Sequence, residues 1–195
     1  MQPLKTLSLT LIGLLLCWQA SAAQIDVNGI KFDDSIEVRG SKLQLNGAGT
    51  RYKAIFKVYA AGLYLTKKAS SLDEVVNAPG PKRLSITMLR SIDSRELGKL
   101  LTRGMEDNVG SAATSKLLPG MMRMSEIFSE HKSMVPGDNF MIEWVPGSGS
   151  VVTVKGKVQG APFPEPEFFR ALMAIWLGPS PADYQLKDAL TGKAN

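Results

Sequence analysis

The arginine at the start of an apolar run is the residue best suited to hold a ligand. Arg51 follows a glycine-broken segment, 45–50, and begins the run 51–65, which is rich in aromatic and β-branched residues. Because an unpaired charge is costly to bury, its guanidinium needs an anion or solvent. Arg51 is therefore the main candidate for contact with an acidic ligand. The alternative is a structural ion pair with an aspartate or glutamate elsewhere in the chain.

The residue sets that usually carry catalysis are mostly missing. The chain has one histidine, His131, and one cysteine, Cys17, too few for a zinc site. No Gly-x-Ser-x-Gly motif marks a nucleophilic serine. Gly47-Ala48-Gly49 lacks the third glycine and the lysine of a phosphate-binding loop. We therefore expect no metal and no cofactor.

One region is unusually rich in methionine and lies near His131. Thioethers with an imidazole could bind Cu(I), but methionines more often fill irregular core space or line an adaptable cavity. All three interpretations are open from the sequence. The residues concerned are Met105, Met121, Met122, Met124 and Met134.

The first residues have the form of a secretory signal peptide. Lys5 precedes the apolar stretch 7–18, and the small residues 20–23 follow. We expect cleavage after Ala22 or Ala23, a single domain over 24–195 and a soluble exported protein, most simply in a bacterial periplasm. No second apolar segment is long enough to span a bilayer. Cleavage would remove Cys17, so the mature chain could form no disulfide.

The charge pattern excludes one class of partner. The full chain carries a net charge of +5, but its lysines and arginines are scattered and no aromatic ladder accompanies them. We therefore expect no nucleic acid as a partner. A mixed, solvated surface explains the charges, although a basic exported protein could also contact anionic lipid or acidic small molecules.

Several stretches have the composition of β-strands. Asn28-Gly29 between apolar residues predicts a hairpin within 24–32, and 35–45 alternates weakly. The run 51–65 holds no proline, asparagine or aspartate, so we expect one strand, covered on both faces in its second half. The other expected strands are 82–89, 140–145 and 150–158.

The expected helices alternate with these strands. Asp93 with Glu96 three residues later resembles a capping box and predicts a helix that contains Leu97 and Leu101. Pro119-Gly120 predicts a break, hence separate helices at 111–118 and 121–131. Two further helices are expected: one that Pro164 and Pro166 introduce and Gly178-Pro179 ends, and a short one near 184–190. This order predicts an α+β domain, an antiparallel sheet with a layer of helices on one face.

Three motifs together resemble the chalcone isomerase-like family, in its bacterial exported branch. They are the Gly-x-Gly-x-Arg stretch 47–51 with its apolar run, the strand 84–90 before a capped helix, and the closing helices around 175–187. The resemblance covers most of the expected mature chain. It implies an open-faced sandwich of this family's type, with a cleft between the sheet and the helices.

The resemblance also shows departures from the enzymes of the family. Plant chalcone isomerases use an arginine, a strand threonine, and a tyrosine and an asparagine on the following helix. Arg51 matches the arginine and Tyr59 falls near the threonine, but Leu97 and Gly104 replace the other two. An apolar leucine cannot donate the missing hydrogen bond, so flavonoid cyclisation is not expected.

A second branch of the family binds fatty acids, and there an arginine and a tyrosine hold the carboxylate. Arg51 and Tyr59 suit this role by type. Eight residues of one extended strand would separate them by about 26 Å, so both could reach one carboxylate only if the chain reverses between them. Tyr52, Tyr64 or a helix residue is the alternative partner of Arg51.

Three hypotheses follow. The first is a non-catalytic, exported binder of a small apolar carboxylate such as a fatty acid, held by Arg51 and Tyr59. The second is an isomerase or intramolecular lyase on an unknown substrate, with Arg51 as the electrophile that stabilises an enolate. The third is a protein-interaction module whose cleft is closed by its own side chains.

Overall fold

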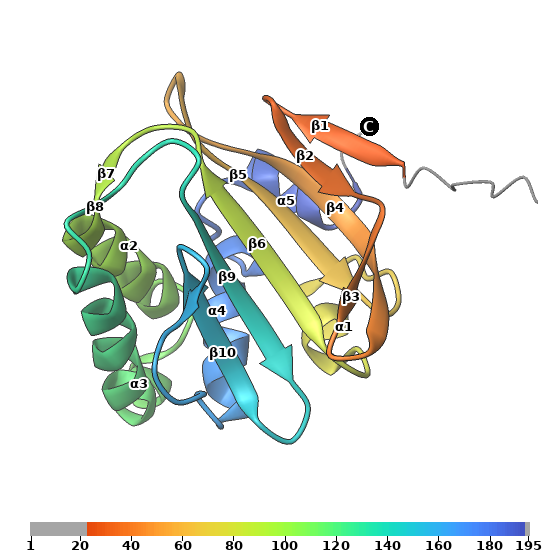
Figure 1. Ribbon diagram of the computed structural model, residues 1–195. Coiled ribbons are helices and arrows are strands. Elements are labelled where there is room, and N and C mark those ends of the chain that lie inside the picture. The colour runs from red at the N-terminus through yellow and green to blue at the C-terminus, as the bar shows by residue number, and fades with distance from the viewer. Residues whose placement is uncertain (1–22, 194–195) are drawn as a thin grey trace, which may run out of the picture.

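A seven-stranded antiparallel sheet forms the centre of the protein, as the computed structural model shows (Figure 1). The structure describes residues 23–193. From one edge to the other the strands run β11, β10, β9, β6, β5, β4 and β3. Their bounds in chain order are β3 (Ser35–Val38), β4 (Ser41–Lys53), β5 (Phe56–Leu65), β6 (Lys82–Met88), β9 (Asn139–Val145), β10 (Gly149–Val154) and β11 (Lys157–Val158).

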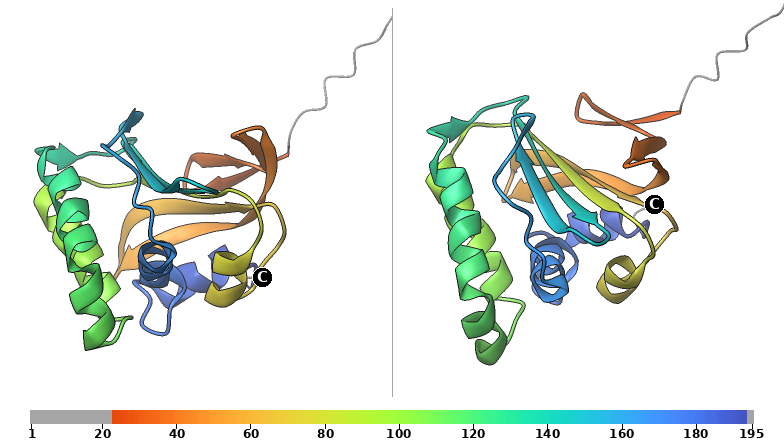
Figure 2. Two further views of the ribbon diagram at one scale, coloured as in Figure 1. Left: turned by 90° about the horizontal axis from the view of Figure 1, so that it is seen from below. Right: turned by 60° about the horizontal axis from the view of Figure 1, so that its bottom comes forward.

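Five helices lie on one side of this sheet (Figure 2). The helices α1 (Leu72–Asn77), α4 (Pro166–Leu177) and α5 (Tyr184–Leu190) lie beneath it, and α2 (Ser94–Glu106) and α3 (Ser111–Ser129) form a hairpin at one end of that layer. A short pair, β7 (Ile92–Asp93) with β8 (Ser133–Met134), joins the ends of this hairpin. The predicted α+β class, with helices on one face, is confirmed.

A small hairpin covers part of the opposite face. It consists of β1 (Gln24–Val27) and β2 (Ile30–Asp33), which reverse at Asn28-Gly29 as the sequence predicts. Both turn residues have positive φ, the conformation that this dipeptide favours in tight hairpins. Phe32 lies directly over Gly62 of β5, where a Cβ would come within 2.5 Å of its ring. The glycine therefore lets the hairpin pack closely on the sheet.

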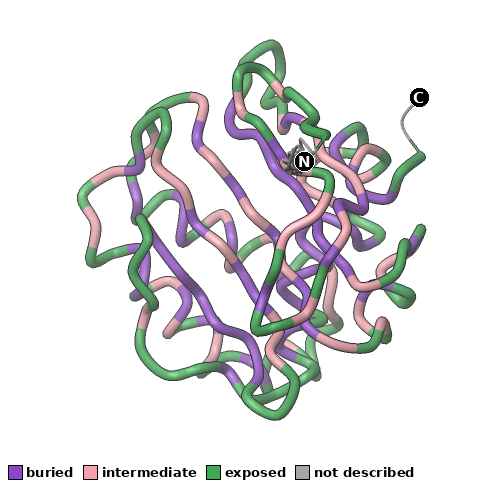
Figure 3. The backbone as a smooth tube through the Cα atoms, turned by 45° about the vertical axis from the view of Figure 1, so that its right-hand side comes forward, coloured by how far each residue is buried: buried purple, intermediate pink, exposed green. Residues whose placement is uncertain are grey.

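The central strand β5 is buried on both faces, as its apolar second half predicts. Tyr59, Ala61, Leu63 and Leu65 belong to the large core between sheet and helices. Ala60 and Tyr64 point the other way and pack in a smaller cluster with Phe32 and the β3–β4 hairpin. Figure 3 shows this buried centre, with the exposed residues gathered at the turns and loops.

The expectation of one continuous strand over 51–65 is wrong. The chain reverses at Ala54-Ile55, so β4 ends at Lys53, β5 begins at Phe56, and the two pair antiparallel. Ala54 has a φ of 53°, a left-handed conformation that usually falls to glycine or asparagine. Because alanine is not a turn former, the composition of this stretch hid the turn.

The expected break at Pro119-Gly120 is also absent, because α3 continues through both residues. Pro119 only removes one helical hydrogen bond donor. Gly120 serves packing instead: a Cβ there would lie 2.7 Å from the ring of Phe168 on α4. The glycine therefore marks close contact between two helices rather than the end of one.

The remaining boundaries differ in smaller ways. The stretch 35–45 is divided by a reversal at Arg39-Gly40, and 150–158 by one at Lys155-Gly156, all four residues with positive φ. The helix α1 was not expected. The predicted cap of α2 is confirmed, since the Asp93 carboxylate accepts hydrogen bonds from the backbone N–H groups of Arg95 and Glu96 at 3.0 and 3.1 Å.

The glycines of β4 allow the last helix to lie directly on the strand. A Cβ at Gly47 would overlap the carbonyl oxygen of Ala189 on α5, and one at Gly49 would lie 2.6 Å from the Ala189 Cβ. Beside them, the buried Asn46 donates to the carbonyl oxygens of Ala69 and Leu190 and accepts from the Ala69 N–H. These contacts fix α5, and the loop between β5 and α1, against β4.

The predicted signal peptide falls in residues 1–22, outside the described part of the chain. None of the helices described has both the length and the apolar character needed to cross a membrane.

We predict that Gly47→Ala lowers the free energy of unfolding by about 2 kcal/mol, because the added methyl group forces α5 away from β4. Urea denaturation of the two proteins would measure the loss. Gly110→Ala is the control for an added methyl group without a clash, since a Cβ there has nothing within 4 Å and its φ is −69°. Because Gly110 is the N-cap of α3, where alanine is disfavoured, we expect a loss there too, but a smaller one than at Gly47. Equal losses in the two variants would show that the close approach of α5 to β4 does not contribute to the free energy of unfolding.

Candidate ligand-binding site

A cavity of about 330 Å³ lies between the β4–β5 hairpin, helix α2 and the end of α4. Its wall is mostly apolar, and Arg51 and Tyr59 are the polar side chains that the sheet contributes. The apolar side chains that line it include Val58, Ile92, Leu97, Leu101, Phe140, Ile175 and Trp176. A volume of this size is at the small end of the range for ligand pockets.

The reversal of the chain at Ala54-Ile55 brings the two predicted binding residues together. Arg51 and Tyr59 are direct partners across the antiparallel pair of β4 and β5. The guanidinium carbon of Arg51 lies 5.9 Å from the centre of the Tyr59 ring, within reach of a cation–π contact. One small anion can therefore touch both side chains, which a single extended strand would not allow.

Helix α4 fixes the direction of the Tyr59 hydroxyl. The Trp176 indole N–H donates to the Tyr59 oxygen at 2.8 Å, and both side chains are buried. An indole can only donate, so Tyr59 is the acceptor here and its own hydrogen is available for another partner. Among the described residues no acceptor takes that hydrogen. The phenol is thus prepared to donate to a ligand in the cavity.

The surroundings keep this phenol neutral. Burial raises the pKa of Tyr59 to about 12, and the charge of Asp183 adds to the rise, while Arg51 and the Trp176 hydrogen bond oppose it. At neutral pH the hydroxyl therefore retains its hydrogen. A neutral phenol next to a guanidinium can donate a hydrogen bond to a carboxylate, whereas a phenolate would repel it.

No carboxylate neutralises Arg51 within residues 23–193. The ion pairs of this region join other residues, and none brings an acid within 4.0 Å of its guanidinium. Asp183 is committed elsewhere: one oxygen accepts the Tyr52 N–H at 2.7 Å and the other caps α5. A structural ion pair for Arg51, the alternative at the sequence level, is therefore not found.

The rim of the cavity is held by an asparagine that sequence reasoning missed. Asn108 follows α2 and donates to the carbonyl oxygens of Gly104 and Ser180, each at 2.8 Å. Its own carbonyl oxygen accepts the Ser180 N–H. The side chain thus ties the end of α2 to the loop between α4 and α5. No local pattern signals this role, because Ser180 lies far along the chain.

The two tyrosines that were alternative partners of Arg51, Tyr52 and Tyr64, do not line the cavity. Tyr64 packs in the small cluster on the opposite face of the sheet. Tyr52 is more than one-third exposed. The helix residues that face Arg51 are apolar or belong to the exposed pair Arg103 and Asp107 at the mouth.

Most of the methionine-rich region belongs to the main core. Met105, Met121, Met124 and Met134 are fully buried in the main core, and Met122 is exposed. Within the part of the chain that is described, no group of three His, Cys, Asp or Glu side chains could hold a metal ion.

The two positions at which the sequence departs from the enzymes both line the cavity. Leu97 and Gly104 offer no polar group to a ligand. A Cβ at Gly104 would lie 3.0 Å from Ile175 Cγ2, so a side chain as large as asparagine needs Ile175 to move. The helix side of the cavity is therefore apolar by packing as well as by residue type.

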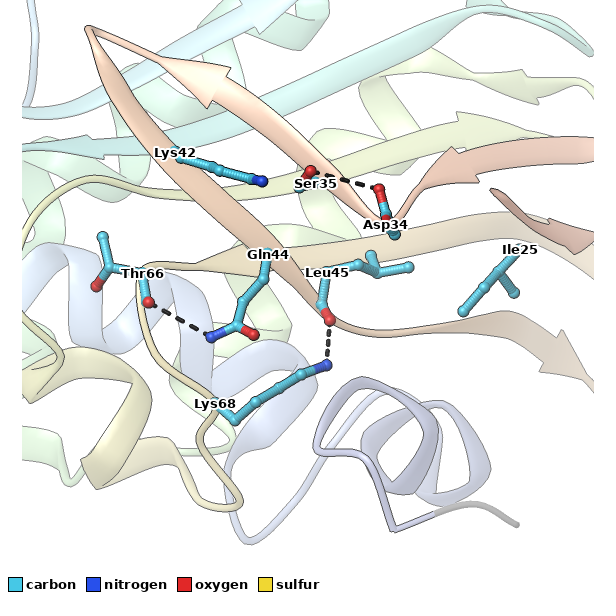
Figure 4. A pocket seen from close by; sticks show the side chains of 8 residues that line it. All are labelled: Ile25, Asp34, Ser35, Lys42, Gln44, Leu45, Thr66 and Lys68. Carbon is cyan, nitrogen blue, oxygen red and sulfur yellow. Dashed lines mark hydrogen bonds between the residues drawn. The ribbon is translucent and has the colours of Figure 1, made fainter. Parts of the chain in front are cut away.

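A second, larger hollow of about 590 Å³ lies at the other end of the sheet, beside the β3–β4 hairpin (Figure 4). Its polar side chains other than Lys42 already have partners within the protein. The Lys68 ammonium donates to the Leu45 and Asn46 carbonyl oxygens, and the Gln44 amide donates to that of Thr66 at 3.4 Å. It therefore offers a ligand fewer unsatisfied groups than the Arg51 cavity does.

The fold and the cavity define an α+β protein with an apolar pocket under a curled antiparallel sheet. The sequence matches the family described as chalcone isomerase-like over residues 23–192, and the chain belongs to that family. The structure is similar to the crystal structure of a fatty-acid binding protein of Arabidopsis thaliana, with a TM-score of 0.64 and 16% sequence identity. That likeness covers 85% of this chain and 93% of the plant protein. The comparison with curated proteins gave no match.

We predict that Tyr59 makes the stability of the protein fall with rising pH between pH 10 and 12. With a pKa of about 12 when folded and 10.0 when unfolded, the folded chain binds more protons in this window. The stabilisation is complete below pH 10 and is lost as the pH rises to 12, on the order of 2 kcal/mol.

Urea denaturation in steps across this window would measure the slope, and Tyr59→Phe is the comparison. Burial also raises the pKa of Tyr64 to about 12, but that residue is common to both proteins, so their difference isolates Tyr59. Parallel curves for the two proteins would contradict the assignment.

Proposed function

We propose that this protein is an exported, non-catalytic binder of a small apolar carboxylate such as a fatty acid. Arg51 and Tyr59 hold the carboxylate, and the cavity between sheet and helices takes the apolar tail. One observation carries the proposal: a guanidinium that has no acidic partner within residues 23–193 lines an apolar cavity, beside a neutral phenol whose hydrogen no acceptor of the same residues takes.

The chemistry of the polar end favours a carboxylate. A guanidinium presents a fork of N–H donors that matches the two oxygens of a carboxylate. The Tyr59 hydroxyl adds a third donor from the neighbouring strand. A neutral ligand would leave the arginine without a counter-charge.

The rest of the cavity favours an apolar tail. Leucine, isoleucine, phenylalanine and tryptophan side chains form its wall below the two donors. Each buried CH₂ of a ligand contributes about 0.8 kcal/mol. The lack of polar groups at Leu97 and Gly104 supports binding over catalysis, because these two positions carry a tyrosine and an asparagine in the plant enzymes.

The comparisons support the same class of ligand. The chain belongs to the chalcone isomerase-like family, and one similar structure is that of a protein named for fatty-acid binding. A cavity at Arg51 argues against an interaction module with a closed cleft. The cavity is equally compatible with the isomerase hypothesis, which a screen for turnover with enones and hydroxylated acids would test.

We predict that Arg51→Ala raises the dissociation constant for fatty acids by about 10- to 100-fold, because it removes a charge-assisted hydrogen bond. Saturated fatty acids from octanoate to palmitate, titrated by displacement of a fluorescent fatty acid, would measure the change. Arg95→Ala, which removes the same charge from an exposed position on α2, should bind like the wild type.

Native mass spectrometry of gently purified protein gives an independent test. We expect an added mass that denaturation releases and that Arg51→Ala lacks. Tyr59→Phe should bind more weakly than the wild type but keep part of the affinity. Equal affinity of the wild type and Arg51→Ala would overturn the assignment of the site.

We also propose that the protein acts outside the cytoplasm, in a periplasm, after removal of its first residues. The predicted mature chain begins at Ala23 or Gln24. Expression of the full chain in a bacterial cell, followed by fractionation and mass measurement, should give a periplasmic protein with one of these two termini. A full-length protein in the cytoplasmic fraction would contradict export.

A further inference from the structure

The turn of the β4–β5 hairpin carries apolar side chains into solvent. Ile55 is 85% exposed and Phe56 54% exposed, the former among the most exposed large apolar residues of residues 23–193. Figure 1 shows this turn beyond the body of the sheet, at the top of the view. Apolar side chains in such a position bury little area inside the protein. Packing within the protein therefore does not account for the presence of apolar residues at this turn.

Cations surround these apolar side chains. Lys53 and Lys57 flank the turn on its two strands, and both are exposed. The guanidinium of Arg90, from the loop after β6, lies 5.0 Å from the centre of the Phe56 ring. The Lys57 ammonium donates to the side-chain oxygen of Asn28 in the neighbouring turn.

The acids near this end of the sheet are engaged in backbone contacts. The Asp26 carboxylate accepts the Gly29 N–H, and Asp183 binds the backbone of Tyr52 and α5. Neither forms an ion pair with Lys53, Lys57 or Arg90. The turn therefore combines an apolar tip with a positive surround.

We propose that the β4–β5 turn docks on the surface of an anionic lipid bilayer, with Ile55 and Phe56 inserted among the acyl chains and the basic side chains at the headgroups. Charge complementarity selects this partner, because peripheral attachment needs both apolar insertion and attraction to anionic lipid. The strand positions link docking to the cavity: Arg51 lies on the same hairpin, three residues before Ala54. On the proposed function, an apolar ligand then enters from the bilayer near the mouth of its site.

Co-sedimentation with vesicles tests the proposal. The protein is the form recovered from cells that express the full chain, with its termini checked by mass spectrometry. We expect it to bind vesicles of equal parts phosphatidylglycerol and phosphatidylcholine, to bind pure phosphatidylcholine much more weakly, and to dissociate as the salt concentration rises. Equal binding to both vesicles, or to neither, would overturn the proposal.

A matched pair of variants localises the contact. Ile55→Glu should weaken binding to the anionic vesicles by about tenfold or more, because it removes the inserted side chain and adds a repelled charge. Val158→Glu likewise replaces an apolar β-branched side chain with glutamate, at a 59% exposed residue of β11, the edge strand farther from β4 and β5, and should bind like the wild type. Equal binding by Ile55→Glu and the wild type would overturn the proposal.

Two further measurements separate this proposal from others. Ile55→Glu should keep the wild-type affinity for fatty acids, and Arg51→Ala should keep most of the binding to vesicles, so either proposal can fail alone. Sedimentation velocity tests a second copy of the chain as the occupant. Self-association that Ile55→Glu abolishes, without any binding to vesicles, would replace the bilayer with a dimer.

Discussion

The reversal at Ala54-Ile55 is the constraint on which the candidate site depends. It divides one apolar run into two antiparallel strands and sets Arg51 opposite Tyr59. The conformation required at Ala54 is unfavourable for alanine, so the turn is held by what the strands gain when they pair and bury β5 on both faces. Long-range packing thus imposes a turn that the local sequence does not favour.

A second consequence of this arrangement is electrostatic. The same pairing places a guanidinium at the edge of the main core, while Asp183, whose charge acts on Tyr59, is committed to the backbone of β4 and α5. Residues 23–193 therefore carry a positive charge beside a cavity without an ion pair to neutralise it. Trp176 completes the arrangement, because its indole N–H donates to the Tyr59 oxygen and leaves the hydroxyl hydrogen free for another acceptor. An arrangement of this kind favours an anionic ligand, because the guanidinium charge and the phenol hydrogen are both left without a partner among the described residues.

The elements with strong local signals could be predicted from the sequence. Asn28-Gly29 predicted the first hairpin, and Asp93 predicted the cap of α2. The alternation of Leu84, Ile86 and Met88 predicted a strand with one buried face. The failures arose where tertiary contact outweighs local preference, as at Ala54 and Pro119. Arg51 could be chosen by its chemistry, but its position opposite Tyr59 depended on a turn that composition did not reveal.

The seating of α5 on β4 has a consequence for the order of folding. The hydrogen bond from Asn46 to the Leu190 carbonyl joins residues 144 positions apart. Domains commonly begin to fold while the ribosome is still at work, and contacts so distant in sequence form late. Here the glycine face of β4 has no cover until α5 has been made. The strand must therefore wait, with its glycines open to solvent, through the synthesis of the four helices and the many strands that separate it from its partner.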